Sequence, residues 1–139
     1  MSKKSAKIAA MIAGLEGRDL SAHYLGFFEC FNQGLFFEAH DVLEELWLAQ
    51  GRAGANYAFH KGLIQFAGAF VHLQKGRLDP ARRLFLLAQA NLRQYPAVHD
   101  RFEAGRALVE ISDWIAVLEV AESNPYPARP APVLRVLER

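Results

Sequence analysis

Apolar residues recur along most of the chain every three or four positions, which is the spacing of one face of an α-helix. We find no convincing stretch with the alternation typical of a half-buried β-strand. The pattern therefore predicts an all-α fold: a single compact bundle of about five helices, arranged as two antiparallel helix hairpins plus a C-terminal helix. The expected helices cover about residues 21–32, 36–50, 55–74, 79–95 and 104–121.

Local signals mark where some of these helices begin and how they pack. Ser21 is a good N-cap for the first of them. Asp79 followed by Pro80 predicts the start of the fourth, because aspartate caps helices and proline suits the first turn. Gly62 and Gly68 lie inside the third helix, where each glycine costs about 1 kcal/mol relative to alanine. We therefore expect them to allow close contact between helices.

The sequence divides into a bundle with two flanking segments. Residues 1–20 form an N-terminal extension, in which lysines precede a short apolar stretch that charged residues soon interrupt. This pattern indicates an amphipathic or frayed helix and not an export signal. Residues 21–122 form the helical bundle domain. Residues 123–139 hold four of the six prolines and are expected to be an extended tail, either draped over the bundle or loose.

Composition narrows the classes of partner and compartment. The chain of 139 residues is 52% hydrophobic, enough for one packed core. Its 16 Lys and Arg nearly balance 15 Asp and Glu, so no nucleic-acid partner or anionic membrane surface is expected. No apolar run approaches the roughly 20 residues that cross a bilayer. The single cysteine, Cys30, fits a reducing compartment, and we expect a soluble cytoplasmic protein.

Polar residues on two adjacent helices form a candidate site. Lys61, Gln65 and His72 share one stripe of the otherwise apolar third helix. On the second helix His40 and Glu44 lie one turn apart, so the carboxylate and the imidazole can touch. A short turn joins these helices, and their polar flanks can meet across a shared cavity. The predicted pocket consists of Glu38, His40, Glu44, Trp47, Lys61, Gln65 and His72.

The chemistry of this pocket allows more than one interpretation. Two histidines with a glutamate and a glutamine suit a divalent metal, with His40, Glu44 and His72 as candidate ligands, or a base and the group that orients it. However, neither the Glu-x-x-His pairs of di-iron bundles nor the His-Glu-x-x-His zinc motif is present. Alternatively, the histidines are boundary residues satisfied within the fold, and Lys61 extends its ammonium to water. No catalytic residue and no cofactor is therefore assigned, and a divalent metal remains an alternative.

A weak internal repeat raises a further alternative. A glycine followed five positions later by a small residue occurs at Gly34 and Ala39 and again at Gly76 and Ala81, 42 residues further on. Such a repeat is similar to tetratricopeptide helix pairs, which bind peptides, although their period is about 34 residues. Two copies are also fewer than a stable stack needs. Ordinary helix hairpins are the favoured interpretation.

Three segments together resemble a known prokaryotic family, domain of unknown function 309. They are FNQGLFFEAHDVLEELW (Phe31 to Trp47), KGLIQFAGAFVHLQKGR (Lys61 to Arg77) and ARRLFLLAQANLRQY (Ala81 to Tyr95). The resemblance implies a compact all-helical bundle with no established activity. It also implies that six residues are signature positions: Glu38, His40, Glu44, Trp47, Gln65 and His72. The chain departs from the family pattern at Asp41, where glutamate is expected, and over residues 96–105.

These observations favour a binding or interaction module over an enzyme. The module would use the pocket beside His40 and His72 or an outer helical face, with a protein partner or a second copy of the chain. A metal-dependent enzyme or metal-binding protein using His40, Glu44, Gln65 and His72 is the alternative. It is less favoured because the sequence contains no complete catalytic signature.

Overall fold

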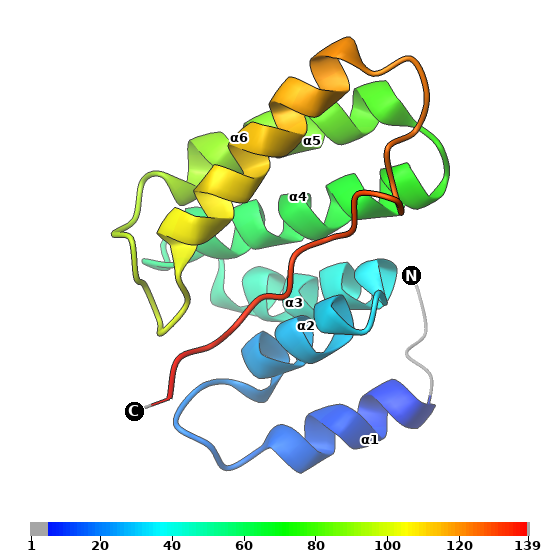
Figure 1. Cartoon of the computed structure of the whole chain (residues 1–139). Coiled ribbons are helices and arrows are strands. Elements are labelled where there is room, and N and C mark those ends of the chain that lie inside the picture. The colour runs from blue at the N-terminus through cyan, green and yellow to red at the C-terminus, as the bar shows by residue number, and fades with distance from the viewer. Residues whose placement is uncertain (1–5, 139) are drawn as a thin grey trace.

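The chain folds into an all-α bundle, as the apolar pattern predicts. The structure, a computed structural model, describes residues 6–138 (Figure 1). Within that range it contains α1 (Ala6–Leu15), α2 (Ala22–Asn32), α3 (Phe36–Gln50), α4 (Tyr57–Gln74), α5 (Leu78–Leu92) and α6 (Ala104–Val120). The fold class is confirmed, but the expectation of about five helices is one too low for this part of the chain.

The additional helix is α1, in the segment that the sequence marked as an extension. Ile8, Ile12 and Leu15 fall on one face of α1 and are buried. α1 packs against α2, where a Cβ on Gly26 would lie 3.5 Å from Ile12 Cγ1. The helix expected within residues 1–20 is therefore present and amphipathic, although it was not counted among the five helices of the bundle. A helix this short gains its stability from packing and not from its own propensity.

α4 is the central helix, with α3 on one side of it and α5 on the other (Figure 1). Phenylalanine rings fill the core around α4; for example, the rings of Phe31 and Phe66 stack with centroids 5.3 Å apart. At Gly62 side chains of α5 approach the backbone of α4 so closely that a Cβ would lie 2.9 Å from Leu92 Cγ. The expected close contact is therefore confirmed at Gly62.

Two of the predicted helix starts have different outcomes. The Ser21 hydroxyl accepts a hydrogen bond from the His23 backbone nitrogen at 3.2 Å, so the predicted N-cap of α2 is confirmed. The prediction that Asp79 caps the next helix is wrong, because α5 begins at Leu78. Asp79 lies instead in the first turn, where its carboxylate is 2.7 Å from the Arg83 guanidinium. An acidic side chain there also opposes the positive end of the helix dipole.

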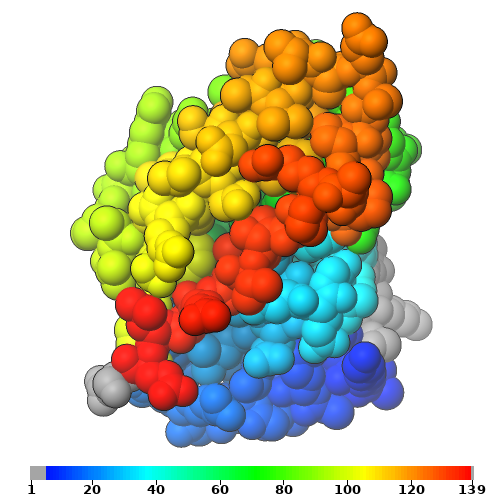
Figure 2. All heavy atoms as spheres, viewed as in Figure 1, coloured from blue at the N-terminus to red at the C-terminus, as the bar shows by residue number. Residues whose placement is uncertain are grey.

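After α6 the chain crosses the face of the bundle as an extended segment (Figures 1 and 2). The Asn124 amide donates to the Leu73 carbonyl oxygen at 2.7 Å. The Tyr126 ring then packs on Phe36 and Phe70. Of the two arrangements expected for the tail, the draped one is observed. Within residues 6–138 no helix combines the length and hydropathy needed to span a membrane.

Candidate functional site

Three helices surround a hollow on the outer side of α4. It has a volume of about 210 Å³. Its polar lining comes from His40 on α3 and from Gln65 and His72 on α4, so three of the seven predicted residues border one space. The rest of the lining is apolar and comes from α3, α4 and α5: Phe37, Ile64, Gly68, Val71 and Leu84. The hollow therefore has a third wall, α5, in addition to the two helices that the sequence indicated.

The shape of this hollow depends on a glycine. Gly68 places no side chain into the space, and a Cβ there would lie 3.2 Å from Leu84 Cδ1. Apolar side chains line the rest of the hollow, and one of them, Phe37, is 46% exposed. A large aromatic ring that solvent reaches beside an apolar hollow is a feature of surfaces that bind other molecules.

The two histidines of the hollow are in unusual polar surroundings. Their Nδ1 atoms are buried and have no hydrogen-bond partner among the described residues. His40 Nε2 lies 3.8 Å from Glu44 Oε2, which is an ion-pair distance but too long for a hydrogen bond. Burial lowers the pKa of His72, and the positive charges of Arg77 and Lys75 lower it further. His72 is therefore neutral at pH 7, so one ring nitrogen can donate a hydrogen bond and the other can accept one.

Gln65 is held in place from the neighbouring helix. The Asn91 side-chain amide on α5 donates to Gln65 Oε1 at 2.7 Å. This bond crosses from α5 to α4 beside the hollow, so it fixes the orientation of one of the three polar lining groups.

The other predicted site residues lie outside the lining of the hollow. Trp47 Nε1 donates to the Tyr57 carbonyl oxygen at 3.0 Å. The Lys61 ammonium lies 5.9 Å from the Trp47 ring centroid and 5.8 Å from that of Tyr57. These contacts form a separate cluster at the start of α4. Glu38 is half-buried in the first turn of α3, where its charge contributes to raising the pKa of Cys30.

The metal interpretation can be compared with the positions of its candidate ligands. His40 and His72 border the same hollow, and Glu44 lies one turn from His40. In the part of the chain that the structure describes, no three His, Cys, Asp or Glu side chains are grouped so that they could hold a metal ion.

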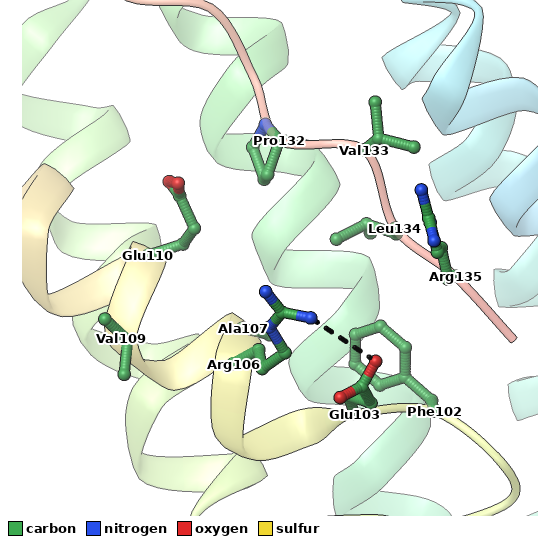
Figure 3. Close-up of a pocket in the computed structure, with 10 residues that line it drawn as sticks. All are labelled: Phe102, Glu103, Arg106, Ala107, Val109, Glu110, Pro132, Val133, Leu134 and Arg135. Carbon is green, nitrogen blue, oxygen red and sulfur yellow. Dashed lines mark ion pairs between the residues drawn. The ribbon is translucent and has the colours of Figure 1, made fainter. Parts of the chain in front are cut away.

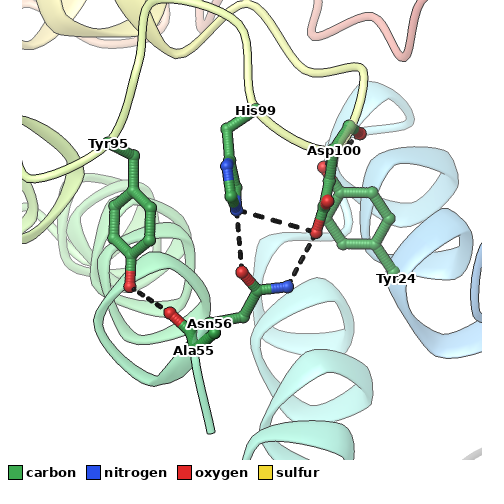
Figure 4. A network of polar contacts seen from close by, with 6 residues as sticks. All are labelled: Tyr24, Ala55, Asn56, Tyr95, His99 and Asp100. Atoms are coloured by element: carbon green, nitrogen blue, oxygen red, sulfur yellow. Dashed lines mark hydrogen bonds and ion pairs between the residues drawn. The ribbon is translucent and has the colours of Figure 1, made fainter.

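Sequence reasoning missed a polar network that joins α4 to the loop before α6 (Figure 4). Asn56 is at its centre: its Oδ1 lies 2.7 Å from His99 Nε2, and its amide nitrogen donates to Asp100 Oδ2 at 2.7 Å. The Tyr24 hydroxyl donates to the Asp100 carbonyl oxygen at 3.0 Å, and the Tyr95 hydroxyl donates to that of Ala55 at 2.9 Å. These bonds join segments that lie 40 to 76 residues apart.

This network holds a strained turn. Asp100 and Arg101 have positive φ values of 45° and 60°, which residues other than glycine seldom adopt. Such strain persists only where the surroundings fix it, and the bonds to Asn56 and Tyr24 do so. Nothing local in the sequence marked Asn56 as a partner of His99 and Asp100.

Comparison with protein families adds one match, and it covers the hollow. Residues 24–84 match the family model described as Domain of unknown function (DUF309), a segment that contains all eight residues lining the hollow. Neither the curated proteins nor the solved structures gave a match to this chain. The resemblance noted in the sequence is therefore confirmed: residues 24–84 match the DUF309 family model.

Proposed function

We propose that this chain is a binding module that receives an apolar side chain of a protein partner in the hollow between α3, α4 and α5. One observation carries the proposal: His40 on α3 borders the same apolar space as Gln65 and His72 on α4, and this space reaches the surface. Apolar pockets with a few convergent polar groups are the usual form of binding sites.

The size of the hollow favours a side chain over a whole small molecule. Its volume of about 210 Å³ is below the range of roughly 300–1,000 Å³ typical of small-molecule sites. Burying one leucine or phenylalanine side chain contributes about 1.5–3 kcal/mol. Occupation of this hollow would therefore act as one anchor within a larger protein contact.

The unpartnered imidazole nitrogens supply the polar part of the recognition. Leaving a buried polar atom without a partner costs about 1–3 kcal/mol. If docking turned either ring toward the partner, a main-chain carbonyl or amide beside the Nδ1 of His40 or His72 would remove that cost. The two histidines would thus select a partner that places a peptide group beside its apolar side chain.

N-acetyl-leucinamide is the probe for this proposal, because it combines one apolar side chain with peptide groups. Titrated into isotope-labelled protein, it should shift the backbone amide resonances of Gly68 and Val71. Gly68→Met, whose flexible side chain would fill the hollow, should abolish these shifts. Gly14→Met is the matched control, since a Cβ at that helical glycine meets nothing within 4 Å. Shifts that persist in Gly68→Met, or no saturable shift at all, would refute the proposal.

A metal-dependent function is the second candidate, because His40 and His72 border the same hollow. Zinc titrated into the protein by calorimetry separates the two functions. Stoichiometric binding that both His40→Ala and His72→Ala abolish would favour the metal function, with Glu44 or Gln65 completing the shell. Heat signals that the two variants leave unchanged would argue against it.

The identity of the partner is part of the same proposal. A second copy of the chain is one such partner, and sedimentation at increasing concentration would reveal it as a dimer that Gly68→Met weakens. We also propose a reducing, cytoplasmic location, which the buried thiol of Cys30 supports.

A further inference from the structure

The segment 132–138 lies along a furrow that remains partly open on both sides. One hollow, of about 560 Å³, separates it from α6 (Figure 3). A second, of about 840 Å³, separates it from α2 and the residues that follow α1. Leu134 and Arg135 border both hollows. Neither hollow shares a residue with the one between α3, α4 and α5.

The furrow holds this segment mainly by its backbone. The Asn32 amide nitrogen donates to the Leu134 carbonyl oxygen at 2.8 Å, and Asn32 Oδ1 accepts from the Leu134 nitrogen at 2.8 Å. On the other side the Leu137 nitrogen donates to the Arg101 carbonyl oxygen at 2.6 Å. Val136 also forms an antiparallel bridge with Phe102 in the same loop. Backbone bonding of this kind accepts many sequences, as when an extended peptide adds to the edge of a sheet.

Side-chain burial in this segment is concentrated at one residue. Leu134 is 6% exposed, whereas Val133 is 71% and Leu137 38% exposed. Figure 3 shows Pro132 and Leu134 on the side of the segment that faces α6, with Val133 and Arg135 on the other side. Ordering these residues has an entropic cost, and one buried leucine with a few hydrogen bonds offsets it only modestly.

We propose that the furrow is a binding site for an extended peptide of a protein partner, and that residues 132–138 occupy it in cis as a replaceable ligand. The peptide places an apolar residue where Leu134 lies and exchanges main-chain hydrogen bonds with Asn32 and with the Arg101 carbonyl oxygen. Side chains larger than those of Pro132 and Leu134 extend into the hollow beside α6, which gives a partner's peptide contacts that the chain's own segment lacks.

A labelled peptide with the sequence of residues 128–138 tests this proposal by fluorescence anisotropy. The wild-type chain should bind it weakly, because a tethered segment competes at a high effective concentration. Leu134→Asp releases the segment and should raise the affinity for the peptide by at least about tenfold. Val133→Asp is the matched control: it adds the same charge at the exposed neighbouring residue and should leave the affinity at the wild-type level. Adding Asn32→Ala to Leu134→Asp should reverse the gain.

Circular dichroism shows whether each variant remains helical, and Leu134→Ala replaces Leu134→Asp if the latter unfolds. Equal affinity of the wild type and the Leu134 variants would overturn the proposal, as would a gain in affinity that Asn32→Ala leaves intact. A wild-type dimer in which two copies exchange these segments, seen by sedimentation and cross-linking, would overturn occupation in cis.

Discussion

His60 should make the stability of this protein depend on pH over a defined range. The side chain is 2% exposed, and its ring centroid lies 5.8 Å from those of both Tyr24 and Phe59. Burial lowers the pKa of His60 from 6.5 to about 4; Asp100 opposes this shift, and the electrostatic interaction with His99 adds to it. The folded protein therefore keeps this imidazole neutral, with its Nδ1 unpartnered among the described residues.

The sign and size of the effect follow from proton linkage. Between pH 6.5 and about pH 4 the unfolded chain binds a proton at His60 that the folded chain does not. The free energy of unfolding therefore falls as the pH falls through this window and levels off below it. The shift in the pKa of His60 from 6.5 to about 4 corresponds to a loss of about 3 kcal/mol in the free energy of unfolding, at 1.36 kcal/mol per pKa unit.

Urea unfolding between about pH 7 and about pH 4.5, followed by circular dichroism, measures this dependence. Carboxylates and His72 also contribute to the slope, so the informative quantity is the difference between the wild type and His60→Phe. Phenylalanine keeps a ring against Tyr24 and Phe59 but cannot take up a proton. The variant should lose stability less steeply than the wild type as the pH falls. Parallel curves would show that burial does not suppress protonation of His60, and the reasoning would fail.

Three further predictions concern packing and hydrogen bonding. Gly62→Ala should lower the melting temperature, because its Cβ would lie 2.9 Å from Leu92 Cγ. Overpacking costs about 1–3 kcal/mol, which exceeds the gain of about 1 kcal/mol in helix propensity. A higher melting temperature would contradict the close approach. The pKa of Cys30 is raised to about 11, chiefly by burial. A thiol reagent should therefore label Cys30 slowly in the folded protein and rapidly in denaturant. Equal labelling rates would contradict its burial. Trp47→Phe should destabilise the protein by about 1–3 kcal/mol in urea unfolding, because the Tyr57 carbonyl oxygen loses its donor; an unchanged midpoint would show that water replaces that bond.

The sequence was most informative where structure depends on neighbouring residues. The cap at Ser21 and the bounds of α3 agree with expectation, because a capping hydroxyl and apolar periodicity act within one or two turns. Asp79 shows the limit of such signals, since aspartate is favourable both as a cap and in the first turn, and only the structure distinguishes these positions.

Contacts between distant segments could not be predicted from one sequence. Asn32 binds Leu134 across 102 residues, and Asn56 binds His99 across 43. Neither asparagine stands out locally, because a side-chain amide can serve many roles. The hollow could be predicted from the sequence only in part. Helical spacing placed Lys61, Gln65 and His72 on one stripe, but the contribution of α5 depended on how the helices pack.

Contacts between N-acetyl-leucinamide and the protein, measured as intermolecular nuclear Overhauser effects, test the central claim most directly. If the hollow between α3, α4 and α5 is the binding site, the methyl groups of the probe should show effects to those of Ile64, Val71 and Leu84, and these should vanish in Gly68→Met. Effects to Leu134 instead, or none at saturating probe, would contradict the assignment of the hollow as the binding site.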